Sequence, residues 1–272
     1  MKQIIVASIL LSLTACGGGG GSDSAATDEQ NPPPSTPSPI VSYGISQPLV
    51  DNSRDQSLIV LLMGNSHARG VQSILQTLIG VGQPNKNVIV QNAPGGGFLA
   101  DRVGDGVSEQ SLESTAWTHV VLQAQKYSSS GTVDYPTTAA KYWIRGSKSV
   151  AATAILFPEH PRRGNTTEGQ TVYNLHYGIA QNENACVAPV GPVWDEALLR
   201  YPNLVLHAKD GNHASATGNF LTALVLYQII TGQLADTIPD ITEAGIDSDI
   251  QQLLRDTVTS VLFLYRPCNY ED

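Results

Sequence analysis

The sequence predicts a three-layer α/β/α fold around a central parallel sheet of about five strands. Apolar runs of strand length recur along the chain, and segments whose apolar residues repeat at helical spacing lie between them. The run from Leu58 to Met63 is apolar throughout, which is typical of a strand that is buried on both faces. Strands that alternate with helices favour a parallel sheet covered on both sides. There is no internal repeat, and one folded domain accommodates the whole pattern.

The predicted elements follow one another in order. The first strand covers residues 58–63 and leads into a helix at 71–80, where Val71, Ile74, Leu75, Leu78 and Ile79 form one apolar face. Further strands are expected at 87–91, 118–125, 151–157 and 185–190. Further helices are expected at 168–181, around 194–200, at 214–231 with Gly232 as its natural end, and at 246–262.

The chain begins with the features of a bacterial lipoprotein signal. Met1 and Lys2 precede a short apolar stretch that ends in Leu-Thr-Ala-Cys16. A positive end, a short apolar segment and small residues before a cleavage point are typical of a signal peptide, and the segment is too short to span a membrane. The last four residues resemble a lipobox, so we expect residues 1–15 to be removed and Cys16 to carry lipids. An ordinary signal peptide, or a Cys that is simply buried, is the alternative.

Residues 16–40 are Gly-rich and then Pro-rich, with too little apolar surface to fold. As a random coil this segment would span roughly 25–30 Å. We therefore expect a tether that holds a folded domain, residues 41–272, away from a membrane.

Composition limits the partners. The 272-residue chain has a formal net charge of −9, which argues against nucleic acid and against attraction to anionic lipid. With Cys16 acylated, Cys186 and Cys268 remain as a pair in an oxidising compartment, and we expect them to form a disulfide. Two buried free thiols are the alternative, because sequence spacing does not fix the distance between Cα atoms.

The apolar run at 58–63 ends abruptly at Gly64-Asn65-Ser66, just before a helix. A strand that delivers a Ser onto such a turn places its hydroxyl at the carboxyl edge of the sheet, where open α/β sheets have their active sites. A Ser that merely caps the helix is the alternative. Far downstream, Asp210-Gly-Asn-His213 supplies an acid and a base from one loop, as nucleophilic catalysis by Ser requires.

Gly-Asn-Ser66 after the first strand and Asp210-x-x-His213 before the long helix at 214–231 resemble the SGNH (GDSL-like) hydrolase superfamily of serine esterases. The resemblance runs from about Leu58 to Gly232 through short blocks. It implies that Ser66 is the nucleophile, that His213 is the general base and that Asp210 orients His213.

The same resemblance implies an oxyanion hole formed by the backbone N–H of Ser66, a glycine N–H after the second strand and a side-chain amide after the third. The glycine falls in Pro94-Gly-Gly-Gly97, where Gly96 is preferred to Gly97 and an ordinary turn is the alternative. The usual Gly-x-Asn-Asp block is replaced by Gln123-Ala-Gln125. Gln125 falls at the Asn position and offers the same amide on a longer arm, unless it is a surface residue without a role.

Other polar and aromatic residues have competing interpretations. His207, Asp210 and His213 have the residue types of a metal site, but a His that closes an apolar strand is more often packed there, so we expect no metal and no organic cofactor. Residues 159–163 follow the fourth strand and could line a substrate pocket or form a solvated loop. Tyr127 and Trp143 suit stacking on a sugar, although aromatic residues are more often part of the core.

Together these observations predict a lipid-anchored serine hydrolase of the cell envelope, outer membrane favoured, that acts on an ester as a monomer. An O-acetyl or similar ester on a glycan is the expected substrate, by analogy with the family alone. An O-acyltransferase of the same fold and a catalytically inactive glycan-binding lipoprotein are the alternatives.

Overall fold

The structure, a computed structural model, describes residues 42–270. The expected signal peptide, Cys16 and the tether lie outside the described residues. Five parallel strands form one sheet in the order β2-β1-β3-β4-β5. The strands are β1 (Ser57–Met63), β2 (Asn87–Asn92), β3 (His119–Gln123), β4 (Thr153–Phe157) and β5 (Cys186–Val187). The predicted parallel α/β/α fold is therefore confirmed.

Nine α-helices lie in the described part of the chain. They are α1 (Ser66–Arg69), α2 (Gln72–Gly82), α3 (Leu99–Arg102), α4 (Val107–Glu113), α5 (Thr138–Ser149), α6 (Glu168–Glu183), α7 (Val190–Arg200), α8 (Ala216–Thr231) and α9 (Ser248–Leu264). Two short 3-10 helices, Ala235–Thr237 and Thr242–Ala244, connect α8 to α9. None of the helices among residues 42–270 is long and apolar enough to cross a membrane.

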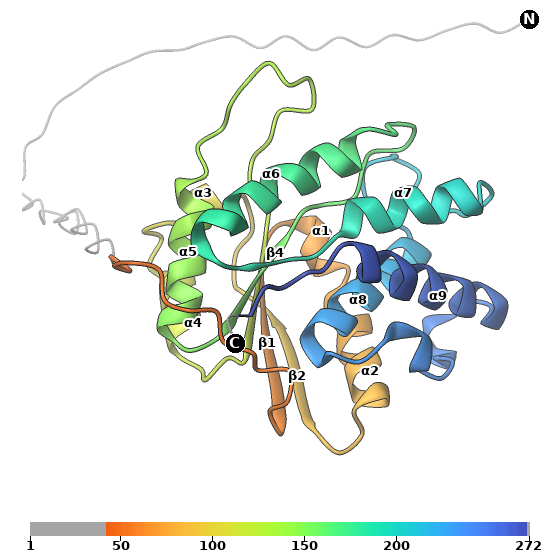
Figure 1. The fold of residues 1–272 in the computed structure, drawn as a ribbon, viewed down its shortest axis with the longest axis horizontal. Coiled ribbons are helices and arrows are strands. Elements are labelled where there is room, and N and C mark those ends of the chain that lie inside the picture. Colours follow the sequence, from red (N-terminus) through yellow and green to blue (C-terminus); the bar gives the residue numbers. More distant parts are fainter. Residues whose placement is uncertain (1–41, 271–272) are drawn as a thin grey trace, which may run out of the picture. The chain divides into compact units, whose positions relative to one another are not determined.

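Two hydrophobic cores lie on opposite faces of the sheet. Leu58, Val60 and Leu62 of β1 pack in one core with α2, α7, α8 and α9, whereas Leu61 and Met63 pack in the other with α3, α4, α5 and α6. Figure 1 shows α2, α8 and α9 on one side of the sheet and α3, α4 and α5 on the other. Because successive side chains of a strand point to opposite faces, a strand between two helical layers buries its side chains on both faces, as the apolar run of β1 does.

The C-terminal segment after α9 returns to the edge of the sheet. Cys186 of β5 and Cys268 are joined in the expected disulfide, which bridges a sequence separation of 82 residues. The N–H of Val187 donates a hydrogen bond to the carbonyl of Pro267, at 2.8 Å. The last strand is shorter than predicted because Pro189 cannot extend its hydrogen bonding and α7 begins at the next residue.

Candidate active site

The strand order fixes where a site can form. From β1 the chain adds β2 on one side and β3 on the other, so the direction of winding reverses between β1 and β3. At such a point the connections at the carboxyl ends of the two strands diverge and leave a crevice, which is where open α/β sheets bind ligands. The turn that carries Ser66 follows β1, and Gln123 ends β3. The sequence therefore places both at the crevice.

The turn after β1 lies tightly against Gln123. A Cβ atom added to Gly64 would lie 2.4 Å from Oε1 of Gln123, so only glycine fits there. The same Oε1 accepts a hydrogen bond from the backbone N–H of Asn65, at 2.9 Å. The side chain of Asn65 accepts from the N–H of His67 and caps α1, which leaves Ser66 exposed at the first position of that helix.

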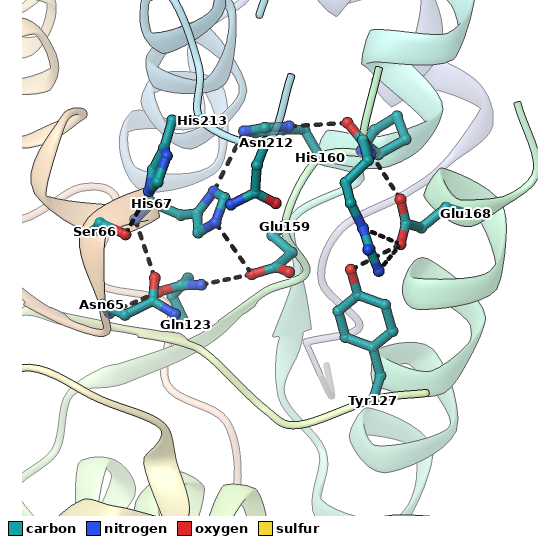
Figure 2. A network of polar contacts seen from close by, with 12 residues as sticks. Asn65, Ser66, His67, Gln123, Tyr127, Glu159, His160, Glu168, Asn212 and His213 are labelled. Atoms are coloured by element: carbon teal, nitrogen blue, oxygen red, sulfur yellow. Dashed lines mark hydrogen bonds and ion pairs between the residues drawn. The ribbon is translucent and has the colours of Figure 1, made fainter. Parts of the chain in front are cut away.

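Ser66, His213 and Asp210 form one hydrogen-bonded line (Figure 2 shows Ser66 and His213). The Oγ atom of Ser66 lies 2.9 Å from Nε2 of His213, and Nδ1 of His213 lies 2.6 Å from Oδ2 of Asp210. A carboxylate only accepts hydrogen bonds, so Nδ1 of His213 carries the proton that it shares with Asp210. In the neutral imidazole Nε2 is then free to accept the hydroxyl proton of Ser66.

The loop before α8 holds the Asp210 carboxylate in place. Its Oδ1 accepts hydrogen bonds from the backbone N–H groups of Asn212 and His213, at 2.9 and 3.0 Å. The hydrogen bond from the His213 side chain, followed by these two backbone N–H groups, lowers the pKa of Asp210 below its ordinary range. Asp210 is therefore ionised at neutral pH, as a residue that stabilises a histidinium cation must be.

Two arginines connect the glycine-rich loop after β2 to the turn that carries Ser66 through hydrogen bonds. The buried Arg102 donates to the carbonyl of Pro94 at 3.0 Å and to the carbonyl of Gly64 at 2.8 Å. Arg69 of α1 donates to the carbonyl of Gly95. Gly96 is exposed next to Arg69, so this loop borders the crevice with backbone that a ligand can approach.

The structure places Gln125 differently from the expectation. Its side chain is buried, and its amide nitrogen donates to the carbonyls of Lys126 and Pro136, at 2.9 and 3.1 Å. Both amide protons are thereby used within the loop after β3, so Gln125 does not offer a donor to Ser66. The cause is Ala124, whose φ of 76° turns the chain sharply at the end of β3. Gln123 is the residue of this block that contacts the turn carrying Ser66.

A cluster of rings lies behind His213, and the sequence did not indicate it. His67 stacks on His213 with 5.1 Å between ring centroids and 17° between planes. On its other side, Nδ1 of His67 lies 3.4 Å from Nε2 of His160, which stacks on Trp194. Nε2 of His67 lies 4.0 Å from the Glu159 carboxylate (Figure 2). Burial is the main cause that lowers the pKa of His67, and the neighbouring carboxylate of Glu159 opposes this shift.

His207 does not join Asp210 and His213 in a ligand set. His207 is buried, and its Nε2 lies 2.8 Å from the carbonyl of Pro161. This is the packed position that the sequence suggested as the alternative to a metal ligand. Among residues 42–270, no group of three His, Cys, Asp or Glu side chains is arranged to hold a metal ion.

The loop after β4 contributes Glu159 and Arg162 to the polar contacts around the site. Glu159 accepts a hydrogen bond from Nε2 of Gln123, at 3.1 Å, and so connects the turn that carries Ser66 to His67. Arg162 pairs with the buried Glu168 at 3.1 Å, and Tyr127 donates to the same carboxylate (Figure 2). Trp143 of α5, by contrast, is buried in the hydrophobic core, where its ring N–H donates to the carbonyl of Leu99.

Similar proteins were found by comparing structures and not by comparing sequences. No protein-family model matches the sequence, and no curated protein matches it. A DUF4886 family protein from Bacteroides uniformis superimposes with a TM-score of 0.63 at 16% identity over 77% of this chain and 96% of that chain. The structure titled TesA gives a TM-score of 0.48 at 14% identity over 64% and 98% of the two chains.

The psychrotrophic esterase EstA from Pseudoalteromonas gives a TM-score of 0.45 at 16% identity, over 65% of this chain and 98% of that one. The superposition on the Bacteroides protein is the one of these three with a TM-score above 0.5, and at 16% identity it speaks for architecture alone. It shows that this chain shares the fold of that protein.

Proposed function

We propose that this protein is a serine hydrolase that cleaves a carboxylic ester through Ser66, His213 and Asp210. The observation that carries the proposal is the hydrogen-bonded line from Ser66 Oγ through the His213 imidazole to Asp210. A capping serine needs no histidine at its hydroxyl, whereas a nucleophilic serine does.

In the proposed reaction the Oγ atom of Ser66 attacks the ester carbonyl carbon while Nε2 of His213 takes the hydroxyl proton. The tetrahedral intermediate collapses, the carbon–oxygen bond to the alcohol breaks, and His213 returns the proton to the departing alcohol. His213 then deprotonates a water molecule, which attacks the acyl-Ser66 ester. The carboxylic acid leaves, Oγ recovers its proton, and water is the only co-reactant consumed.

We place two backbone donors at the developing oxyanion, the N–H of Ser66 and the N–H of Gly96. Supporting this, Arg69 and Arg102 hold the glycine-rich loop against the Ser66 turn, and pre-aimed donors often supply the largest share of transition-state stabilisation. Gln123 acts as a positioning residue, because its amide joins Asn65 to Glu159.

Hydrolysis of p-nitrophenyl acetate by the full chain tests the proposal. We expect Ser66→Ala and His213→Ala each to lower kcat/KM by about 10³-fold or more. Ser73→Ala, which removes an exposed hydroxyl from α2, is the matched control and should hydrolyse the ester like the parent. A parent no faster than Ser66→Ala would refute ester hydrolysis and favour acyl transfer to a sugar or plain glycan binding.

We further propose that the chain is anchored in the cell envelope through lipids on Cys16, and that its substrate is an O-acetyl or similar ester on a carbohydrate. The motif Leu-Thr-Ala-Cys16 and the Gly/Pro-rich segment after it support the anchoring. Cys16→Ser should move the protein from the membrane fraction to the soluble fraction and remove acyl chains from its N-terminal peptide in mass spectra. Unchanged fractionation would contradict the anchor.

A further inference from the structure

A cavity of about 550 Å³ opens at the edge of the sheet opposite to Ser66. Its wall includes Arg54, which lies shortly before β1, and Lys86, which lies directly before β2. Both residues therefore lie at the amino edge of the parallel sheet, whereas Ser66 follows the carboxyl end of β1. A strand rises by about 3.3 Å per residue, so the 7 residues of β1 separate the two edges by roughly 20 Å. The cavity is thus a site apart from the proposed catalytic residues.

The end of α8 and the segment after α9 form the rest of the wall. Gly232 ends α8, and Arg266 and Cys268 come from the segment after α9. The disulfide between Cys268 and Cys186 of β5 holds this segment against the sheet. Three positively charged side chains, from parts of the chain that are far apart in sequence, therefore line one cavity.

The charges on this wall are unbalanced. Arg54, Lys86 and Arg266 are its cations, and Asp51 is the one carboxylate among the described residues that line it. Asp51 accepts a hydrogen bond from the N–H of Ser53, at 3.0 Å, and Lys86 donates to the carbonyl of Ser53, at 2.8 Å. Within residues 42–270, neither Arg54 nor Arg266 forms an ion pair with a carboxylate. In a chain whose net charge is −9, this local excess of positive charge favours an anion as the occupant.

The size and the apolar side of the cavity suit an anion that carries an organic part. Ile229, Leu234 and Leu262 contribute apolar surface beside the cations. The volume falls within the range of small-molecule sites, about 300–1,000 Å³. Three cations against one carboxylate leave two positive charges in excess, and a phosphate monoester carries about −1.5 to −2 charges at pH 7. Arginine side chains also match the geometry of phosphate oxygens.

We propose that this cavity binds an organic phosphate, with the phosphate group between Arg54, Lys86 and Arg266 and the organic part against the apolar side. Unpaired arginines are ordinary on a protein surface, but these two share a cavity with a third cation and with apolar side chains. The phosphate group belongs either to a soluble ester such as glycerol 3-phosphate or to the headgroup of an anionic phospholipid. Both present the same charged oxygens to the same three side chains.

The first test measures thermal unfolding of the full chain with glycerol 3-phosphate, with inorganic phosphate and with potassium chloride at equal ionic strength. We expect glycerol 3-phosphate to raise Tm in a saturable manner and chloride not to, because a ligand that binds only the folded state stabilises it. Arg54→Gln and Arg266→Gln should each weaken the apparent affinity about tenfold, the scale of a lost charge-assisted hydrogen bond. Both side chains are exposed, so the variants should fold like the parent.

The double variant Arg54→Gln/Arg266→Gln has a matched control in Lys141→Gln/Arg200→Gln. The control removes the same number of positive charges from α5 and α7, at residues that do not line the cavity. It should bind glycerol 3-phosphate like the parent, whereas the first double variant should lose binding. Equal affinities of the two double variants, or equal responses of the parent to phosphate and chloride, would overturn the proposal.

The second test separates the two sources of the phosphate group. The Cys16→Ser protein, which cannot carry the proposed lipid, is floated with phosphatidylcholine vesicles that contain or lack phosphatidylglycerol. Binding that requires phosphatidylglycerol and is lost with Arg54→Gln/Arg266→Gln assigns the site to a lipid headgroup. Binding of glycerol 3-phosphate without binding to vesicles assigns it to a soluble ester. Binding of neither would overturn the proposal.

The chain's own carboxylates are the competing occupants. The sequence continues after Tyr270 of the cavity wall with Glu271 and Asp272. We expect Glu271→Gln/Asp272→Asn to bind glycerol 3-phosphate with the affinity of the parent. A parent that binds no phosphate compound, beside a variant that does, would show that these two carboxylates neutralise the cations, and the proposal would fall.

Discussion

At the scale of single residues, His67 deserves a test as a positioning residue for His213. Its ring stacks on the His213 imidazole, and its two ring nitrogens lie near His160 and Glu159. The burial that lowers its pKa keeps it uncharged at neutral pH, so it provides a flat surface that would not repel the cation which the proposed reaction forms on His213. His67 thus limits how far the proposed base can rotate away from Ser66.

We expect His67→Ala to lower kcat on p-nitrophenyl acetate by about 10- to 100-fold, the cost of small misplacements in active sites, with little change in KM. His67→Phe keeps a flat ring and should recover most of the lost kcat. The split between kcat and KM, together with this rescue, separates positioning from a general loss of folded protein. Full activity in His67→Ala would show that Asp210 alone is sufficient to hold His213.

Gly64 is the residue where the geometry of the turn depends on the absence of a side chain. An added Cβ would lie 2.4 Å from Gln123 Oε1 and 2.9 Å from Ala68 Cβ. We expect Gly64→Ala to lower the free energy of unfolding by about 1–3 kcal/mol and to reduce esterase activity, because the turn carrying Ser66 must shift.

Gly80 of α2 is the matched control, since a Cβ there meets nothing within 4 Å. Gly80→Ala should stabilise the protein by up to about 1 kcal/mol, as alanine does in exposed helices, and leave activity intact. Urea denaturation of the three proteins measures both effects. Equal stability of Gly64→Ala and the parent would contradict the tight contact with Gln123.

At the scale of elements, the sequence identified those with a simple hydrophobic pattern. The strands and helices α2, α6, α7, α8 and α9 were predicted because one or both of their faces pack into a core, which the apolar spacing reflects. The short helices α3 and α4 carry too few apolar residues to show a period. Helix α5 was missed even though Ala139, Ala140, Trp143 and Ile144 give it a buried face, so its signal was available.

The residues of the candidate site that belong to a recognisable sequence motif were predictable. Those whose position depends on an irregular backbone conformation were not. Ser66, Asp210 and His213 were indicated by residue type and position, and the structure brings them together. Gln123, and not Gln125, contacts the turn that carries Ser66, because Ala124 between them has a left-handed backbone conformation. The sequence does not indicate that conformation, since alanine rarely adopts it. The approach of Glu159 and His160 to His67 is a tertiary contact that a single sequence does not encode locally.

Also at this scale, the disulfide fastens the segment after α9 to the edge strand β5. Because it closes a loop spanning 82 residues of sequence separation, reduction should enlarge the conformational freedom of the unfolded chain. We expect dithiothreitol to lower the free energy of unfolding by about 2–4 kcal/mol. The Cys186→Ala/Cys268→Ala protein should have this lower stability from the start and should not respond to the reductant. A parent insensitive to dithiothreitol would contradict the prediction, provided mass spectrometry shows the bond reduced.

At the scale of the whole molecule, buried histidines make the fold sensitive to acid. Burial lowers the pKa of His119 to about 3, of His160 to about 3 and of His176 to about 4. In the unfolded chain the same groups titrate near 6.5. Between about pH 6.5 and 4 the unfolded state therefore binds more protons than the folded state at these three sites, so stability falls as the pH falls.

Asp195 acts in the opposite direction, because burial raises its pKa to about 6 and the folded state then binds the extra proton below that pH. The balance at these four groups is about two protons in favour of the unfolded state. Near pH 5 the free energy of unfolding should fall by roughly 2–3 kcal/mol per pH unit, and full stability should return above about pH 6.5.

His176→Gln isolates one of these protons. Nδ1 of His176 contacts the carbonyl of Val172 four residues earlier in α6, at 2.8 Å, and a glutamine amide can make the same contact without titrating. Urea unfolding at pH 7, 6 and 5 should show the variant losing about 1.4 kcal/mol per pH unit less than the parent in the acid range. A parallel dependence on pH in the two proteins would mean that His176 takes up its proton equally in both states, and that the acid sensitivity of the fold comes from other groups.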